Sequence, residues 1–413
     1  MRGAPAGPKR NSVTENQAPE QGVILVGGLG TRLGELTRNQ PKPLLTVGDA
    51  PFLDELIWRL ARFKFRRLLL LTGYKAEKFT DYLAQRAREM AVDIEMIVEP
   101  EPLGTAGALR FAADELEPTF YLLNGDSLFD FNWLDLVPLA ASHSPLVAMA
   151  LRHEPDASRF GVVEIDGERV VGFRERGGPA GGTINGGVYL ISRDIVPFLP
   201  ENGSLERDIL PGLSARGRVC GRVYDGFFID IGTPASFAQA PALLRANRQR
   251  AAVFMDRDGV LNVDHGYVHR IDHFDWLPGA IEAVKLINDS GRYAFLVTNQ
   301  AGVARGYYPE SQIGVLHHQI QQVLRAHGAH LDDIRYCPYH PEGEVPAYKR
   351  TSDWRKPKPG MILDIIEHWQ IDVAHSLLIG DKPSDMSAAA QAGIEGHLFT
   401  GGDLLNFVAP LIR

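Results

Sequence analysis

The sequence predicts an α/β protein with two domains, and three observations lead to this prediction. The chain has 413 residues, and at roughly 100–200 residues per domain this length favours two or three domains. Two segments, beginning at residues 22 and 251, open alike, with an apolar strand, then a loop of Gly or Asp, then a helical pattern. Short apolar runs alternate with helix-like stretches on both sides of the second opening. Examples of these apolar runs are residues 68–71, 120–123, 294–297 and 377–379. Such alternation is typical of βαβ units with mostly parallel sheets.

The domain boundary is predicted near residues 239–250, where a polar, basic stretch precedes the second opening. We therefore expect one domain over residues 21–243 and another over residues 244–413. Residues 1–20 contain Gly, Pro, Asn and Gln without an apolar stretch, so we expect a disordered leader and no signal peptide there.

The composition excludes several classes of function. A net charge of −8 argues against general nucleic-acid binding, and no apolar run approaches the length that spans a bilayer. The two cysteines, Cys220 and Cys337, are far apart and form no disulfide framework. We expect a cytoplasmic protein whose partners are small molecules, with neither nucleic acid nor membrane among them. Phosphorylated ligands then require local cationic sites.

The first opening contains a candidate phosphate-binding loop, which directly follows a strand. Glycines there let backbone N–H groups approach a phosphate closely, and a following helix N-terminus favours the anion. A simple glycine-rich turn is the alternative, because glycine patterns alone often mislead. The loop is not a P-loop, since no Gly-Lys-Ser/Thr sequence follows. Lys42 stands between two prolines, which hold the backbone extended and aim the side chain. The loop residues are Gly27, Gly28, Gly30, Thr31 and Arg32.

Two acidic residues, Asp126 and Asp230, each follow an apolar strand pattern. Such a carboxylate alone is often a turn former or a helix cap. As a pair, they could hold Mg²⁺ against the phosphates of a nucleotide, which requires one or two carboxylates.

These motifs, with those at residues 99–107, 123–126, 185–189 and 228–232, resemble the sugar-phosphate nucleotidyltransferase family from about residue 21 to residue 230. The resemblance implies a Rossmann-like domain with a mixed, mostly parallel sheet. It also implies that a sugar 1-phosphate oxygen attacks the α-phosphorus of an NTP and releases pyrophosphate, so that catalysis consists of positioning and charge neutralisation.

The resemblance further implies which residues act in this domain. The glycine loop, Arg32 and Lys42 would bind the triphosphate, while Asp126 and Asp230 would hold Mg²⁺. Arg176 stands where many relatives have Lys for the sugar phosphate, which keeps the charge but changes the donor geometry. The other substrate-binding residues would be Gly104 for the nucleotide, Asn185 and Gly186 for the sugar, and Asn124 beside Asp126.

The second opening places Asp256 and Asp258 at the end of an apolar strand. Two acids so close together repel each other, so their presence indicates a bound cation or a catalytic role. Asp256 could attack phosphorus while Asp258 protonates the leaving oxygen and later activates water. A calcium-type loop or a plain Asp turn is the alternative. Further strand ends and loops supply Thr298, Lys356, Asp381 and Asp385.

The order of acid pair, hydroxyl, lysine and acid pair resembles the phosphatases of the haloacid dehalogenase superfamily. This resemblance implies a Rossmannoid domain in which Asp256 is the nucleophile and Asp258 the acid/base. It implies that Thr298 and Lys356 steady the phosphoryl group. Asp381 would hold Mg²⁺ with Asp256 and the backbone carbonyl of Asp258.

Three finer segments, at residues 262–268, 298–306 and 336–341, resemble the heptose 1,7-bisphosphate 7-phosphatase family. Histidinol-phosphatases are the nearest relatives in pattern, but the segment 265–267 favours the heptose enzymes. The resemblance places the following residues around the substrate: Asp264, His265, Gly266, Tyr267, Asn299, Gln300, Ala301, Arg355 and Lys382.

One departure from this family concerns its structural zinc, which is often held by three cysteines and a histidine. Here only Cys337 is present, and Tyr339, Ser352 and Trp354 occupy the other ligand positions. Because one thiolate cannot make a four-coordinate site, we predict no zinc and a loop held by packing. We also expect His317 and His318 to be solvated, and Phe227, Phe228, Tyr307 and Tyr308 to serve packing.

Taken together, the two halves predict consecutive reactions. The phosphatase would leave a heptose 1-phosphate, and the first half most resembles the heptose 1-phosphate guanylyltransferases, so GTP and a GDP-heptose are expected. Two alternatives stay open. One is a hexose 1-phosphate nucleotidyltransferase using another NTP, fused to a histidinol-phosphatase-like or other small-molecule phosphatase. The other is a regulatory or binding protein with one inactive domain, against which the intact acids argue.

Overall fold

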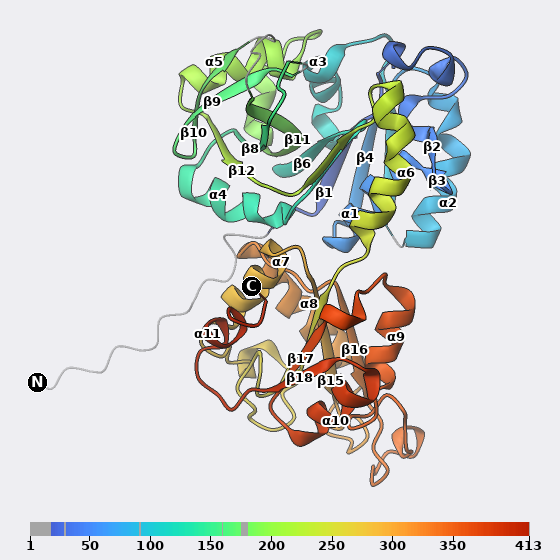
Figure 1. Ribbon diagram of the computed structural model, residues 1–413, viewed down its shortest axis with the longest axis vertical. Helices are drawn as coiled ribbons and strands as arrows, with labels where there is room; N and C mark the ends of the chain where they lie inside the picture. Colours follow the sequence, from blue (N-terminus) through green and yellow to red (C-terminus); the bar gives the residue numbers. More distant parts are fainter. Residues whose placement is uncertain (1–17, 29, 91, 159, 175–180, 413) are drawn as a thin grey trace, which may run out of the picture.

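The computed structural model describes residues 18–28, 30–90, 92–158, 160–174 and 181–412. It forms two α/β domains, one above the other in Figure 1. Both predicted features, the α/β class and the two domains, are thereby confirmed. No helix of the described residues is both long enough and apolar enough to cross a membrane.

The N-terminal domain is built on a nine-stranded sheet in the order β5-β4-β1-β6-β11-β8-β12-β10-β9. Strands β10 and β11 run against the rest, so the sheet is mixed, as predicted, but its antiparallel pairings are as numerous as its parallel ones because these two strands lie inside the sheet. Its strands are β1 Gln21–Leu25, β4 Arg67–Thr72, β5 Asp93–Val98, β6 Thr119–Asn124, β8 Val147–Glu154, β9 Val162–Asp166, β10 Arg169–Arg174, β11 Gly182–Ser192 and β12 Val219–Val223.

Helices cover both faces of this sheet because successive strand residues point to opposite sides. Ile24 packs into the core cluster under α1, α2, α4 and α6, whereas Val23 packs into the cluster under α3 and α5. A separate two-stranded ladder, β7–β13, brings Asp230 opposite Ser127. The bounds are α1 Phe52–Arg62, α2 Thr80–Met90, α3 Gly104–Phe111, α4 Leu136–His143, α5 Leu210–Ala215, α6 Pro234–Arg248, β2 Thr46–Val47, β3 Ala50–Pro51, β7 Ser127–Asp130 and β13 Phe227–Asp230.

The C-terminal domain has a fully parallel five-stranded sheet in the order β16-β15-β14-β17-β18. Helices α7, α8 and α11 cover one face, and α9 and α10 cover the other. The bounds are β14 Ala252–Met255, β15 Tyr293–Asn299, β16 Asp333–Cys337, β17 Leu377–Gly380, β18 Glu395–Leu398, α7 Ala280–Asp289, α8 Ser311–Ala326, α9 Gly360–His368, α10 Pro383–Ala392 and α11 Leu404–Val408.

The junction between the domains is short. Helix α6 passes through the predicted boundary at residues 243/244, and three residues then separate it from β14. Most of the expected leader lies outside the described residues, which begin at residue 18. Residues 18–20 contact α8, because Arg325 donates a hydrogen bond to the carbonyl oxygen of Pro19. The division at residue 243 stays a prediction.

The interface between the domains contains buried polar contacts. Asp332, which directly precedes β16, accepts hydrogen bonds from Arg62 of α1, from His330 and from the backbone N–H of Ala294. Burial opposes the charged form of this carboxylate, but Arg62 and His330 lower the pKa of Asp332 well below its usual range. The two domains are therefore joined by a fully buried charged cluster as well as by the chain.

This interface lies at the amino ends of parallel strands in both domains. Arg66, which precedes β4, contacts His318, and Gln322 donates to Glu20, which precedes β1. On the other side, Arg250 precedes β14 and Asp332 precedes β16. Sites in α/β sheets form at the carboxyl ends of the strands, so both domains direct those ends away from the interface.

The expectation that His317 is solvated is wrong, although His318 is exposed. His317 is only 6% exposed, because this face of α8 is covered by packing that its polar neighbours in sequence do not reveal. Burial, with the nearby charge of Arg257, lowers the pKa of His317 to about 3.

Replacing His317 by Gln is expected to flatten the pH dependence of stability. The folded state holds this imidazole neutral, whereas the unfolded chain protonates it near its ordinary pKa of 6.5. Its contribution is therefore fully present above pH 6.5 and is lost as the pH falls towards 3. Between pH 7 and pH 5 the free energy of unfolding should therefore fall by about 2 kcal/mol through this histidine alone.

Urea unfolding of the C-terminal domain at pH 7 and pH 5 measures the effect. The wild-type difference in unfolding free energy should shrink in His317→Gln and stay unchanged in the matched His318→Gln. Equal differences in all three proteins would show that His317 is not held neutral.

Candidate active sites

The glycine loop after β1 forms one wall of a cavity of about 450 Å³. Gly30 has a φ of +62°, and a Cβ there would lie 2.9 Å from the Thr37 methyl group. A Cβ on Gly125, at the end of β6, would lie 2.4 Å from the carbonyl oxygen of Leu25. Glycine is thus required where the two strand ends meet. The predicted residues that line this cavity are Gly27, Gly28, Gly30, Thr31, Arg32, Lys42, Gly104, Asn124 and Asp126.

Lys42 brings together the two predicted metal-binding acids. Its Nζ lies 2.7 Å from Asp126 Oδ2 and 3.7 Å from Asp230 Oδ1. Lys42 is only 6% exposed, and Asp230 is further fixed by the backbone N–H of Gly232, which donates to its Oδ1. The acids lie 104 positions apart in sequence and meet because β7 and β13 pair. The result is an anionic site with a single embedded ammonium group, suited to triphosphate and divalent cations.

A second cavity, of about 960 Å³, continues from Arg32, Asn124 and Asp126 towards Asn185. Asn185 donates to the Tyr189 hydroxyl, which donates in turn to Glu206 Oε1 at 3.2 Å. Glu206 also accepts from Thr105 and lines both cavities. Sequence reasoning missed Glu206, although its place just before Arg207 and Asp208 on a helical turn could have drawn attention to it.

Gly186 is not among the residues that line the described cavities. A Cβ on Gly186 would lie 2.2 Å from the Phe129 ring, so this glycine allows close packing, and the neighbouring Gly187 faces the cavity. Arg176 lies outside the described residues.

The second site forms where β14, β15 and β17 end. Lys356 is buried, and its Nζ lies 2.9 Å from Asp256 Oδ2 and 2.7 Å from Asp385 Oδ1. Burial opposes the charge, but these two carboxylates raise the pKa of Lys356. Asp385, in the first turn of α10, was not among the residues assigned a role at this site, and its contact with Lys356 depends on how α10 follows β17.

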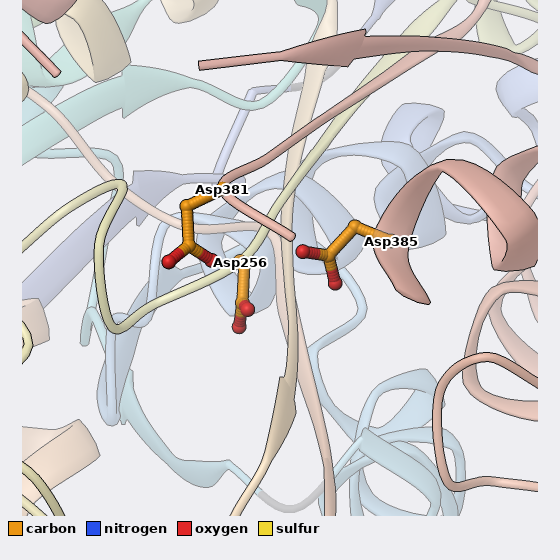
Figure 2. Close-up of side chains that lie close together, drawn as sticks. All are labelled: Asp256, Asp381 and Asp385. Carbon is orange, nitrogen blue, oxygen red and sulfur yellow. The ribbon is translucent and has the colours of Figure 1, made fainter. Parts of the chain in front are cut away.

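Asp381 completes a cluster with Asp256 and Asp385, in which one oxygen from each carboxylate lies within 4.8 Å of the others (Figure 2). Burial raises the pKa of Asp381, and the neighbouring acids contribute. Its Oδ1 is buried without a hydrogen-bond donor. Since carboxylate oxygens are the preferred ligands of Mg²⁺, these residues fit a magnesium ion.

Asp258 is held in one orientation by its neighbours. Arg257 Nη2 contacts both carboxylate oxygens, at 3.0 and 2.9 Å. Gln300 donates to Asp258 Oδ2 at 3.1 Å and to Thr298 Oγ1 at 2.9 Å. Asn262 donates to Asp258 Oδ1. Sequence reasoning did not single out Arg257, which turns inwards and is fully buried.

The remaining predicted residues surround this centre. Lys382 donates to Asp264 at 3.0 Å. Burial opposes both charges, but this contact raises the pKa of Lys382 and lowers that of Asp264. Asn299 and Lys356 exchange hydrogen bonds at 3.1 Å, which ties the lysine loop to β15. Ala301 begins the turn that follows β15, and its carbonyl oxygen accepts from the backbone N–H of Arg305.

The segment 264–267 forms an exposed loop at the mouth of the site. His265 pairs with Asp275 at 2.7 Å, and the Gly266 N–H donates to Asp264. Tyr267 meets the Tyr307 ring edge-on at 4.6 Å. Tyr307 is 56% exposed but packs against this loop through that ring contact, and Tyr308 is buried and donates to Gln300.

The loop at residues 337–354, for which the sequence predicts no zinc, is held by side-chain contacts. The Arg350 guanidinium lies 3.8 Å from the centre of the Tyr339 ring. Tyr336 and Tyr348 both donate to Glu310. Cys337 is buried, with its Sγ 3.8 Å from the Tyr339 carbonyl oxygen. That this loop binds no zinc stays a prediction.

Comparisons with known proteins find a match for each of the two domains. Residues 21–247 match the family described as nucleotidyl transferase, and residues 353–404 match that described as HAD-hydrolase-like. A D-glycero-beta-D-manno-heptose-1,7-bisphosphate 7-phosphatase of Rhodopseudomonas palustris is 43% identical over 164 residues, which are 40% of this chain and 91% of that protein. Its Escherichia coli K12 counterpart is 44% identical over 35% of this chain and 75% of that protein. The crystal structure of HddC from Yersinia pseudotuberculosis is 31% identical, with a TM-score of 0.50, over 55% of this chain and 100% of that one.

Proposed function

Since the chain belongs to the nucleotidyl transferase family and carries a HAD-like phosphatase domain, we propose that it catalyses two consecutive steps in making a nucleotide-activated heptose. The C-terminal domain removes the 7-phosphate of D-glycero-D-manno-heptose 1,7-bisphosphate. The N-terminal domain then transfers GMP from GTP to the resulting heptose 1-phosphate, giving GDP-heptose and pyrophosphate. In this proposal the enzyme works in the cytoplasm on small molecules alone.

One observation carries the proposal: each sheet ends in its own cluster of carboxylates around a buried lysine. Lys42 lies between Asp126 and Asp230, and Lys356 lies between Asp256 and Asp385. A single such cluster would suit one phosphate reaction. Two clusters in separate domains suit two reactions on a substrate with two phosphates.

In the phosphatase domain, Asp256 attacks the phosphorus, and the bond from phosphorus to the sugar oxygen breaks. Asp258, oriented by Arg257 and Gln300, donates its proton to that oxygen. Asp258 then takes a proton from water, which attacks the phosphorus and releases phosphate and free Asp256. Lys356 and the Thr298 hydroxyl hold the phosphoryl oxygens throughout.

In the transferase domain, the sugar 1-phosphate oxygen attacks the α-phosphorus and pyrophosphate leaves. The glycine loop, Arg32 and Lys42 hold the triphosphate and offset its growing charge. Asn185 and Glu206 line the cavity in which the sugar would lie. Mg²⁺, when bound by Asp126 and Asp230 or by Asp256, Asp381 and the Asp258 carbonyl, would neutralise phosphate charge in each site.

A single assay tests the proposal. Purified protein, Mg²⁺ and GTP are incubated with the α- or the β-anomer of the heptose bisphosphate, and phosphate and nucleotide sugar are followed together. Formation of both products supports it. Phosphate without GDP-heptose, with another NTP consumed instead, would overturn the guanylyl step. Faster hydrolysis of histidinol phosphate or hexose bisphosphates would overturn the heptose step.

We also expect the intermediate to pass through solvent. Helix α3 borders the nucleotide cavity and α10 carries Asp385, and these two helices lie at opposite ends of the molecule (Figure 1). An equimolar mixture of Asp256→Asn and Asp126→Ala proteins should therefore make GDP-heptose at the wild-type rate for the same concentration of active sites. A mixture several times slower, while each intact site keeps its own activity, would indicate direct transfer within one chain.

A further inference from the structure

A third cavity lies between the two domains, away from both active sites. Its volume is about 400 Å³, within the roughly 300–1,000 Å³ typical of small-molecule sites, which are frequent at domain interfaces. The end of α1 and residues 64–66 line it from the N-terminal domain, and α8 with the start of β16 lines it from the C-terminal domain (Figure 1). None of its lining residues has a role in the two proposed reactions. A ligand here would touch both domains without reaching the catalytic groups.

One face of α8 presents buried nitrogen atoms to this cavity's wall without hydrogen-bond partners among the described residues. They are His317 Nε2, Gln321 Nε2 and Arg325 Nε. The three residues are only 6%, 8% and 2% exposed, and their spacing of four positions places them on one side of the helix. Gln321 already accepts from the Leu331 N–H through its Oε1, so its amide nitrogen is the end left over. Because buried donors without acceptors are costly, these groups indicate a ligand that supplies acceptors.

The opposite wall contributes two cations from the segment between α1 and β4. Lys64 Nζ donates to the carbonyl oxygen of Asp332, and Arg66 Nη2 donates to His318 Nδ1 at 2.9 Å. Both partners are neutral groups of the other domain. In the part of the chain that the structure describes, neither Lys64 nor Arg66 forms an ion pair with a carboxylate. Their positive charge is therefore available to a ligand in the cavity that they line.

The acids that line the cavity do not offset this charge. Asp333 is paired with Arg335 at 2.7 Å, outside the set of lining residues. Glu20 lies 4.0 Å from Arg325 Nη1, at the limit of an ion pair. The cavity thus has three cationic side chains against one acid that is not otherwise neutralised, which favours an anionic ligand.

We infer that this interdomain cavity binds a small phosphorylated molecule that bridges the two domains. The inference goes beyond the proposed function and does not depend on it. A phosphate dianion matches guanidinium and ammonium donors and would accept from Arg325 Nε and Gln321 Nε2. A phosphate group fills only part of about 400 Å³, so the rest of the ligand would pack on Phe65 and Ile334, which also line the cavity. Since its contacts come from both domains, the ligand stabilises their docked arrangement.

Hydrogen–deuterium exchange of the full-length protein tests this site. The probes are inorganic phosphate, glucose 1-phosphate and GDP, with succinate as a carboxylate probe and sodium chloride at equal ionic strength as the blank. At least one phosphorylated probe should slow exchange in residues 62–67 and in residues 317–325 together. A stronger effect of glucose 1-phosphate identifies a sugar phosphate as the ligand, and a stronger effect of GDP identifies a nucleotide. The inference is overturned if no phosphorylated probe protects both segments, or if succinate protects them equally.

Variants separate this site from phosphate binding at the active sites. Arg66→Ala, at an exposed position, should abolish the protection of both segments and weaken binding of the effective probe in calorimetry roughly 10–100-fold. Arg66→Lys, which keeps the charge without the fork, should fall in between. Arg218→Ala is the matched control, because Arg218 is an exposed arginine of the same domain that does not line the cavity.

Undiminished protection in Arg66→Ala would show that the response is transmitted from an active site, and the inference would fall. The response of the glycine loop after β1 to GTP is read in the same experiment and judges the proposed function separately. If that loop ignores GTP while residues 62–67 and 317–325 respond to a phosphorylated probe, the interdomain site stands and the nucleotidyl transfer falls. The reverse pattern leaves the proposed function and removes the interdomain site.

Discussion

Asp256→Asn is expected to lower phosphate release by roughly 10³-fold or more, because it removes the nucleophile of a covalent reaction. The amide has nearly the volume of the carboxylate, so packing around β14 should persist. Lys356 would keep Asp385 as a partner at 2.7 Å, which limits the loss of stability. The same variant should convert supplied heptose 1-phosphate and GTP to GDP-heptose at the wild-type rate.

Phosphate release from the bisphosphate, measured beside GDP-heptose formation from the monophosphate, separates these effects. Asp353→Asn is a suitable control, because Asp353 is a largely exposed acid of the same domain that pairs with Lys358. If Asp256→Asn kept a tenth of wild-type hydrolysis, Asp256 could not be the nucleophile. If both activities fell together, the variant would be misfolded or the domains coupled.

Lys42→Met should lower nucleotidyl transfer roughly 10²–10³-fold, the range observed when one donor to a developing charge is removed. Methionine keeps much of the length of the side chain but leaves Asp126 and Asp230 without the ammonium group that now lies 2.7 and 3.7 Å from them. Their mutual repulsion would then act on the triphosphate as well. Phosphate release by the other domain should not change.

Pyrophosphate release from GTP and heptose 1-phosphate measures this loss. The exposed Lys78, replaced by Met, is the matched control. Lys42→Arg should recover part of the activity, since it restores the charge in a less compact form. A Lys42→Met protein with near-normal transfer would place the triphosphate elsewhere.

Much of the fold could be predicted because each strand that carries a functional acid is short, apolar and followed by a distinctive loop. Both strands that open the domains, β1 and β14, lie where the sequence placed them. The meeting of Asp126 with Asp230 was suggested only as a pair of strand ends. This contact depends on the β7–β13 ladder, which joins residues about 100 positions apart. A pairing over that distance produces no periodic pattern in the sequence.

The parts that sequence reasoning missed depend on where side chains turn after a strand ends. Arg257 stands between two acids and turns inwards to support Asp258, which the alternation of the strand does not indicate. Asp385 reaches Lys356 only because α10 begins directly after Asp381 and Lys382. His317 looked solvated because its neighbours in sequence are polar, yet the packing around α8 buries it.

The buried contacts between the domains also bear on how such a fusion evolves. HddC corresponds to 55% of this chain, so the contacts of α1 with a second domain lie outside the part that the two proteins share. Here Phe63 packs against His330, Trp58 meets Trp369, and Arg62 reaches Asp332. Separating the two domains would expose the rings of Trp58 and Phe63 on one product and take Arg62 away from Asp332 on the other. The fusion is therefore hard to reverse, and the two activities are inherited together.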